Sequence, residues 1–183
     1  MDRNVTWVVL AYAAVVCACG AAYEPSDGEP GSGIYALTIE GDSDACAPAR
    51  ATGIMGKVAV VAQSSELAVM VPDTLGAVGA TSRVVLQQAA GAHTSTEVAV
   101  PGCDGTMLRR EWTMLGAGSD AVEVAYSESW TGVGACTSAA APSLPRTDCR
   151  AEQRLRYDRA MSCEAPCQIV WAPTTGALTC ECR

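Results

Sequence analysis

Cysteine is the residue that most restricts how this chain can fold. The 183 residues include ten cysteines, and eight of them lie beyond the first forty positions. An even number of cysteines in an exported chain predicts a disulfide framework, in this case up to four bonds whose pairing the spacing alone does not determine. The eight candidates are Cys46, Cys103, Cys136, Cys149, Cys163, Cys167, Cys180 and Cys182.

The N-terminal stretch indicates that the chain is exported. Residues 5–18, VTWVVLAYAAVVCA, carry no charge over fourteen positions. This is shorter than the roughly 20 residues that a membrane-spanning helix needs, and it suits the apolar part of a cleaved signal peptide. We therefore expect the rest of the chain to fold in an oxidising compartment.

The end of this stretch, Val16-Cys17-Ala18-Cys19-Gly20, resembles the lipobox of bacterial lipoproteins. The resemblance implies cleavage after Ala18, lipidation of Cys19 and a lipid-anchored position in the cell envelope, at the outer membrane or cell surface. The match departs from the usual pattern at Val16, where Leu is common, and at Cys17, where Ala or Ser is common. The alternative is an ordinary signal that is cut near Gly20-Ala21-Ala22.

Three segments are expected along the chain. Residues 1–18 form the signal peptide, and residues 19–33 form the lipidated N-terminus with a flexible tether rich in Gly, Pro and acidic residues. Residues 34–183 form one disulfide-rich domain.

The fold class follows from short strand-like runs that are separated by turn-rich segments. This pattern predicts a mainly β protein, a single antiparallel sandwich or barrel-like domain that disulfides hold together. Two segments, Ser82–Ala92 and Ala151–Met161, fit either a helix or a strand. The expected strands are Ile34–Glu40, Lys57–Gln63, Glu66–Pro72, Arg83–Gln88, Glu97–Val100, Met107–Leu115, Ala121–Trp130, Gln153–Arg159, Gln168–Trp171 and Ala177–Cys182.

The last two expected strands narrow the pairing of the C-terminal cysteines. A five-residue loop joins them, a length typical of a β-hairpin. The hairpin brings Cys167 beside Cys180 and Cys182, so one of these should bond Cys167, and Cys163 or a more distant cysteine should bond the other. A metal site is the competing interpretation, but the spacings differ from the C-x2-C pairs of structural zinc, and an exported chain favours disulfides.

Charge excludes some partners. The formal net charge is −8 and the pI is about 4.6, so general electrostatic binding to nucleic acid or to an anionic membrane face is disfavoured. We expect no cofactor and no metal.

The most informative candidate site lies on the expected hairpin of Met107–Leu115 and Ala121–Trp130. If Leu115 lies opposite Ala121, the apolar faces of the two strands coincide, and Arg110 and Glu128 come within diagonal reach. The residues of interest on this face are Arg110, Trp112, Tyr126, Glu128 and Trp130. They could line the mouth of a ligand pocket, but we favour a structural ion pair at the rim of the core.

Other polar residues are weaker candidates. Glu123 and Glu128 are five apart, so a regular strand points them to opposite faces and they cannot act as a glycosidase-like acid pair. His93 is expected in a solvated loop, and Asp42-Ser43-Asp44 in a solvated turn. The arginines of residues 146–159 alternate with acids, as in a paired, solvated face.

Taken together, these features predict an exported bacterial lipoprotein of the cell envelope that acts as a non-catalytic binding or structural module. Its expected partners are the membrane, through the lipid anchor, and an envelope protein or small ligand. A carrier with a lipocalin-like barrel cavity is the alternative, and a secreted hydrolase is a weaker one, because the sequence supplies few catalytic groups.

Overall fold

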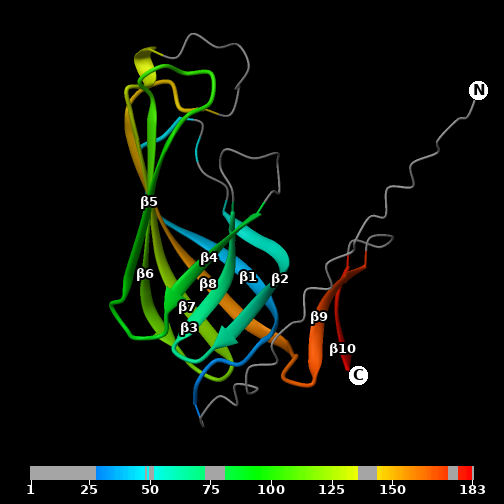
Figure 1. Cartoon of the computed structure of the whole chain (residues 1–183). Helices are drawn as coiled ribbons and strands as arrows, with labels where there is room; N and C mark the ends of the chain where they lie inside the picture. Colours follow the sequence, from blue (N-terminus) through cyan, green and yellow to red (C-terminus); the bar gives the residue numbers. More distant parts are fainter. Residues whose placement is uncertain are drawn as a thin grey trace, which may run out of the picture.

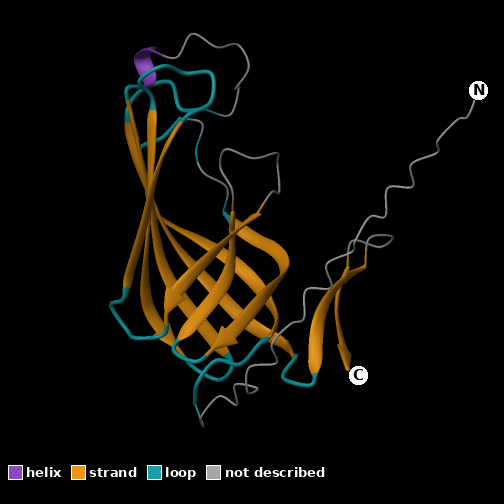
Figure 2. Ribbon diagram, in the orientation of Figure 1, coloured by secondary structure: helices purple, strands orange, loops and turns teal. Residues whose placement is uncertain are grey.

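The computed structural model of the chain describes residues 28–47, 49, 52–72, 81–135, 144–172 and 177–182. These residues form strands and one short 3-10 helix, η1 (Figure 2). The strands are β1 (Gly33–Asp44), β2 (Gly53–Gln63), β3 (Glu66–Pro72), β4 (Thr81–Gln87), β5 (His93–Ala99), β6 (Met107–Ala117), β7 (Ala121–Thr131), β8 (Cys149–Ser162), β9 (Cys167–Ala172) and β10 (Ala177–Cys182), and η1 spans Val133–Ala135. The expected mainly β class is confirmed.

Strands β1 to β8 form one antiparallel sheet in the order β4-β3-β2-β1-β8-β7-β6-β5. Strands that follow each other in sequence are paired, except for β4 and β5, which form the two edges of the sheet. The first strand, β1, also pairs with the last, β8. The edges approach each other where the Thr94 hydroxyl donates a hydrogen bond of 3.5 Å to the carbonyl oxygen of Val85. The sheet is therefore a nearly closed barrel with its seam between β4 and β5 (Figure 1).

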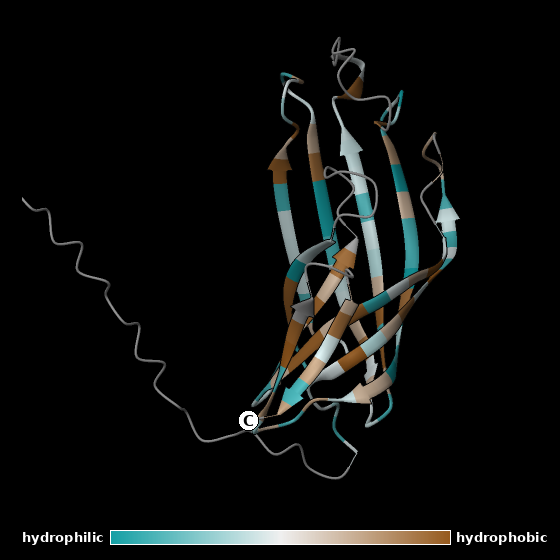
Figure 3. Cartoon of the chain, turned by 90° about the vertical axis from the view of Figure 1, so that its right-hand side faces the viewer, coloured by the Kyte–Doolittle hydropathy of each residue, from teal (hydrophilic) through white to brown (hydrophobic). Residues whose placement is uncertain are grey.

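Side chains fill the inside of the barrel. Hydrophilic and hydrophobic residues alternate along the strands (Figure 3), as expected for a sheet with one buried face. In β8, for example, Leu155 and Tyr157 are buried and Arg156 between them is exposed. The main apolar core includes the fully buried rings of Tyr35, Trp112 and Tyr157. An eight-stranded barrel is only just wide enough for such side chains, so these rings occupy much of its interior.

Two tyrosines inside the barrel have satisfied hydroxyl groups. The Tyr157 hydroxyl donates to the carbonyl oxygen of Met70 at 3.1 Å, and the Tyr35 hydroxyl donates to that of Gly31 at 2.8 Å. Burial raises the pKa of both phenols above the ordinary value, and Arg159, which donates to the Tyr35 oxygen, partly offsets the rise in the pKa of Tyr35.

A second, smaller core lies where β6, β7 and β8 extend beyond the barrel toward η1 (Figure 1). It packs Leu108, Trp130 and Ala151 of these strands against residues of the neighbouring loops. These residues are Cys46, Val100 and Cys103, together with Val133 of η1. The molecule thus has two apolar clusters along one continuous sheet.

Packing begins before the first strand. Pro30, Gly31 and Gly33 are buried, and Ser32 Oγ both accepts a hydrogen bond from the Ala62 amide at 3.0 Å and donates to the Ala62 carbonyl oxygen at 3.4 Å. At Gly33 a Cβ atom would collide with the carbonyl oxygen of Met161. The end of the segment expected to be a flexible tether is therefore packed against the barrel. The expected signal peptide, residues 1–18, and Cys19 lie outside the described residues.

Each expected strand is present, and both ambiguous segments contain strands rather than helices. Ser82–Ala92 contains most of β4, and Ala151–Met161 lies within β8, which pairs with β1 on one side and β7 on the other. The expectation of a polar loop around His93 is wrong, because β5 begins there and pairs with β6. This edge strand has too few apolar residues to show an alternating pattern.

Disulfides connect distant parts of the sheet. Cys46 bonds Cys149, which joins the end of β1 to the start of β8 across 103 residues of sequence. Cys103 is also disulfide-bonded, and Cys136 lies outside the described residues.

The C-terminal hairpin of β9 and β10 forms a separate two-stranded sheet beside the barrel (Figure 1). Cys167 bonds Cys182 within it, and Cys163 at the end of β8 bonds Cys180. The hairpin expectation is confirmed, since Cys182 bonds Cys167 and Cys163 bonds Cys180. The four sulfur atoms that a metal site would need as ligands are therefore bonded in disulfides.

The long-range disulfide should stabilise the barrel more than the hairpin disulfide does. We expect the Cys46→Ala/Cys149→Ala variant to lose about 2 to 4 kcal/mol in free energy of unfolding, because the bond closes a long loop of the unfolded chain. The matched variant Cys167→Ala/Cys182→Ala should leave the barrel transition almost unchanged. Urea unfolding followed by far-ultraviolet circular dichroism measures both, and equal losses would contradict the expectation.

Candidate functional site

The candidate residues lie on the hairpin of β6 and β7, but in a different register from the one expected. Arg110 is directly opposite Glu128, and Trp112 is opposite Tyr126. The expected pairing is wrong by two residues, because the strands continue past Leu115 through a bulge between Met114 and Gly116. A shift of two residues keeps every side chain on its face, so the predicted inward set is retained.

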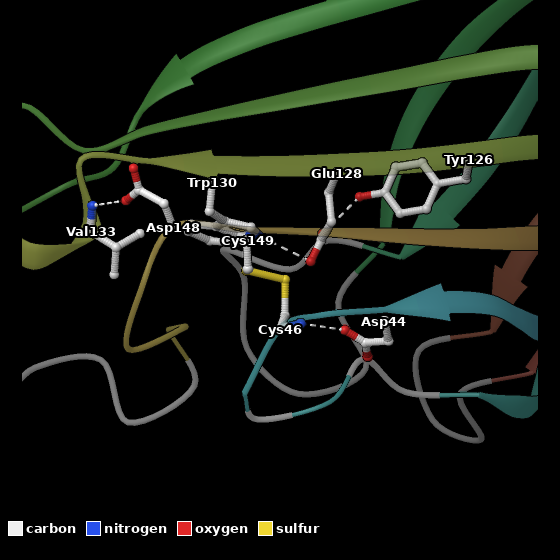
Figure 4. The surroundings of a disulfide bond; sticks show 8 residues. All are labelled: Asp44, Cys46, Tyr126, Glu128, Trp130, Val133, Asp148 and Cys149. Atoms are coloured by element: carbon white, nitrogen blue, oxygen red, sulfur yellow. Dashed lines mark hydrogen bonds between the residues drawn. A yellow bond between two sulfur atoms is a disulfide. The ribbon is translucent and has the colours of Figure 1, made fainter.

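Glu128 is the centre of this group. It is 0% exposed, and its two carboxylate oxygens accept hydrogen bonds from neighbours on its own strand. The Tyr126 hydroxyl donates to Oε2 at 3.0 Å, and the Trp130 indole N–H donates to Oε1 at 3.1 Å (Figure 4). Tyr126 and Trp130 can both reach it because residues two apart on a strand share a face. These bonds offset part of the cost of burying a carboxylate.

Arg110 and Gln153 complete a buried polar layer around Glu128. Arg110 is 8% exposed and Gln153, on β8 opposite Tyr126, is 6% exposed. Gln153 is not among the residues predicted from the sequence. Its place between Ala151 and Leu155 in the inward alternation of β8 was the signal that could have identified it.

The polar layer lies between the two apolar clusters. Along β6, Arg110 separates Leu108 of the smaller core from Trp112 of the main core. Along β7, Glu128 separates Trp130 from Tyr126 in the same way. Arg110 of β6 and Glu128 of β7 thus lie opposite each other at the boundary between the two apolar clusters. This position supports a structural role for the polar layer.

Trp112 has a buried polar atom. Its ring is stacked on Tyr126 with centroids 5.6 Å apart, and its indole N–H has no hydrogen-bond partner among the described residues. Leaving a buried donor unsatisfied costs free energy, so this position would tolerate an apolar ring.

The remaining candidate groups do not converge with Glu128. Glu123 points outward and accepts a hydrogen bond of 3.1 Å from Arg156, which confirms that Glu123 and Glu128 lie on opposite faces. His93 is exposed, and its Nδ1 lies 3.2 Å from Thr113 Oγ1. Asp42-Ser43-Asp44 is the exposed end of β1 rather than a turn, and Asp44 accepts a hydrogen bond of 2.8 Å from the Cys46 amide.

Two arginines of β8, Arg150 and Arg156, are paired with acids on the outer face, as expected. Arg150 Nε lies 2.9 Å from Glu152, and Arg156 Nε lies 2.9 Å from Asp158. The hydrogen bond and charge of Asp158 raise the pKa of Arg156. Since these side chains are about half exposed, the pairs contribute little to stability.

Two surface hollows lie along the outer face of β5 to β8, with volumes of ≈ 370 Å³ and ≈ 270 Å³. Glu111 and Arg150 line both of them. The larger also includes Glu97 and Arg109, and the smaller includes His93. Neither is lined by Arg110 or Glu128, although Tyr126 and Gln153, which belong to the surroundings of Glu128, line the smaller one.

Comparison with known proteins adds no family. No family model matches the chain, and searches of curated proteins and of solved structures found no similar protein. Among the described residues, no helix is long and apolar enough to span a membrane.

A substitution at Glu128 should distinguish its buried position from an exposed carboxylate on the same strand. We expect Glu128→Ala to lower the free energy of unfolding by about 3 to 5 kcal/mol, because the buried charge of Arg110 would lose its opposite carboxylate and two donors would lose their acceptor. Glu123→Ala, the matched control on the outer face, should leave the urea midpoint nearly unchanged. Equal effects of the two substitutions would contradict the structural role.

Proposed function

We propose that this chain is an exported lipoprotein of the bacterial cell envelope, anchored through Cys19, whose disulfide-stabilised barrel acts as a non-catalytic binding or structural module. The observation that carries the proposal is the state of the described cysteines, all of which are disulfide-bonded. Such a framework is typical of oxidising compartments. It agrees with the apolar leader and with the lipobox-like sequence that ends at Cys19.

The distribution of polar groups supports a non-catalytic role. A catalytic site needs an acid, base or nucleophile that converges with its partners on a reacting atom. The Glu128 carboxylate is enclosed and accepts hydrogen bonds on both oxygens, whereas His93 lies on the outer surface. These two groups are therefore poorly placed to act together.

The filled barrel favours binding at the outer surface. A small-ligand carrier needs interior space, and eight-stranded barrels either fill that space with side chains or hold one small ligand. In this barrel the rings of Tyr35, Trp112 and Tyr157 take the interior positions. A partner would instead meet the outer face, where the hollows around Glu111 and Arg150 lie.

The anchor can be tested by mass and by cell fractionation. We expect the protein from the native membrane fraction to have the mass of the chain from Cys19 onward plus acyl chains. Thiol alkylation should add nothing before reduction and eight groups to cysteine thiols after it. A soluble, unlipidated species with free thiols would contradict the proposal.

A matched pair of leader variants separates the anchor from the rest of the leader. Cys19→Ser should abolish acylation and release the protein from the membrane fraction, because the lipidated atom is the Cys19 sulfur. Cys17→Ser should leave acylation intact, since serine is common at this position of a lipobox. Retention of the Cys19→Ser protein in the membrane would show that another feature holds it there.

A further inference from the structure

The sulfur atoms of the C-terminal hairpin lie unusually close together. Cys167 and Cys182 form one disulfide, and Cys180 belongs to another, with Cys163. The Sγ atoms of Cys167, Cys180 and Cys182 nevertheless all lie within 4.8 Å of one another. The register explains this proximity, because Cys182 is opposite Cys167 and Cys180 is two residues away on the same face of β10.

Exposure differs strongly among these cysteines. Cys182 is exposed and Cys167 is partly exposed, whereas Cys163 is only 3% exposed. The disulfide of the barrel is more protected than the outer hairpin bond, since Cys46 is 6% exposed and Cys149 packs against the smaller apolar core. Of the three disulfides whose cysteines are both described, a thiolate from solution can therefore reach Cys167–Cys182 most easily, because thiol–disulfide exchange requires access to a sulfur atom.

We propose that the Cys167–Cys182 disulfide is a site of thiol–disulfide exchange, and that Cys180 relays the exchange inward to release Cys163. The co-reactant is a dithiol reductant. One of its thiolates attacks Cys182 Sγ, the Cys167–Cys182 bond breaks, and Cys167 leaves as a thiolate. This thiolate is then the nucleophile nearest to the inner disulfide.

The second step is internal to the hairpin. Cys167 attacks Cys180 Sγ, a Cys167–Cys180 bond forms, and Cys163 leaves as a thiolate that takes up a proton. The second thiol of the reductant resolves the mixed disulfide at Cys182 and leaves Cys182 as a thiol. In sum, one dithiol is oxidised to its disulfide, and the protein gains two thiols, at Cys163 and Cys182.

The consequence would be a rearranged attachment of the hairpin. In the starting state the Cys163–Cys180 bond ties β10 to the end of β8. After the exchange one disulfide of the hairpin remains, between Cys167 and Cys180, and it lies within β9 and β10. The hairpin would then keep its chain connection to β8 and the contacts of β10 with β1 and β2.

The positions of glutamate make the test specific. Folded, disulfide-bonded protein is treated with dithiothreitol below one equivalent, quenched with acid, alkylated and cleaved by a glutamate-specific protease. Cleavage after Glu164 and Glu181 separates Cys163, the segment with Cys167 and Cys180, and Cys182 into three peptides. Mass spectrometry then identifies the two labelled cysteines of each molecule that has gained two thiols.

The expected product carries label on Cys163 and Cys182, and its remaining disulfide joins Cys167 to Cys180. Two-thiol species labelled only on Cys167 and Cys182 would overturn the relay. So would label on Cys163 and Cys180 with the outer bond intact, or first opening of Cys46–Cys149.

The control variant removes the acceptor and keeps the outer disulfide. Cys163→Ala/Cys180→Ala should open at the same rate as the unchanged protein, and its label should appear only on Cys167 and Cys182. A much slower opening of this variant would show that Cys180 or Cys163, rather than the outer pair, is the first sulfur attacked. The labelling map of the unchanged protein remains decisive if the variant does not fold.

Discussion

The pairing of β1 with β8 is the interaction on which the rest of the structure depends. It joins the first and last strands of the eight-stranded sheet, so it turns a series of hairpins into a barrel with an interior. The pairing closes a loop of more than a hundred residues and carries the corresponding entropic cost. The Cys46–Cys149 bond lies at its end, where the Ala45 amide still donates to the Arg150 carbonyl oxygen at 3.0 Å. The covalent bond thus restricts the unfolded chain at the contact that is hardest to form.

The arrangement of this sheet also explains why a carboxylate can be buried in the protein. β6, β7 and β8 extend past the barrel, and a second apolar cluster covers their far ends. Arg110 and Glu128 lie at the boundary between the two clusters, where neither charge is solvated freely. Hydrogen bonds from Tyr126 and Trp130 hold the Glu128 carboxylate in one orientation. This network ties the register of β7 to that of its neighbours, because a slip of one residue would turn Glu128 outward.

Several features could be predicted from local sequence because local chemistry determines them. The strands follow from alternation and turn residues, and the inward set of β6 and β7 follows from a period of two. The outer position of Glu123 follows from the same rule. The pairing of Cys167 with Cys182 was narrowed in advance, since a short loop leaves few partners. By contrast, the strand at His93 was missed because an edge strand with polar residues lacks the apolar signal.

The sequence by itself determined the strand content, the faces of the strands and the restricted choice of partners for the C-terminal cysteines. Each of these depends on residues close together in the chain. Only the tertiary structure decided that the sheet forms a nearly closed barrel, that Arg110 lies directly opposite Glu128, and that Gln153 is buried opposite Tyr126. It also decided that three sulfur atoms from two disulfides meet in one hairpin. The physical reason is that long-range strand pairing and β-bulges set the register. The free energies of alternative pairings depend on residues far apart in the chain, so no short stretch of sequence determines them.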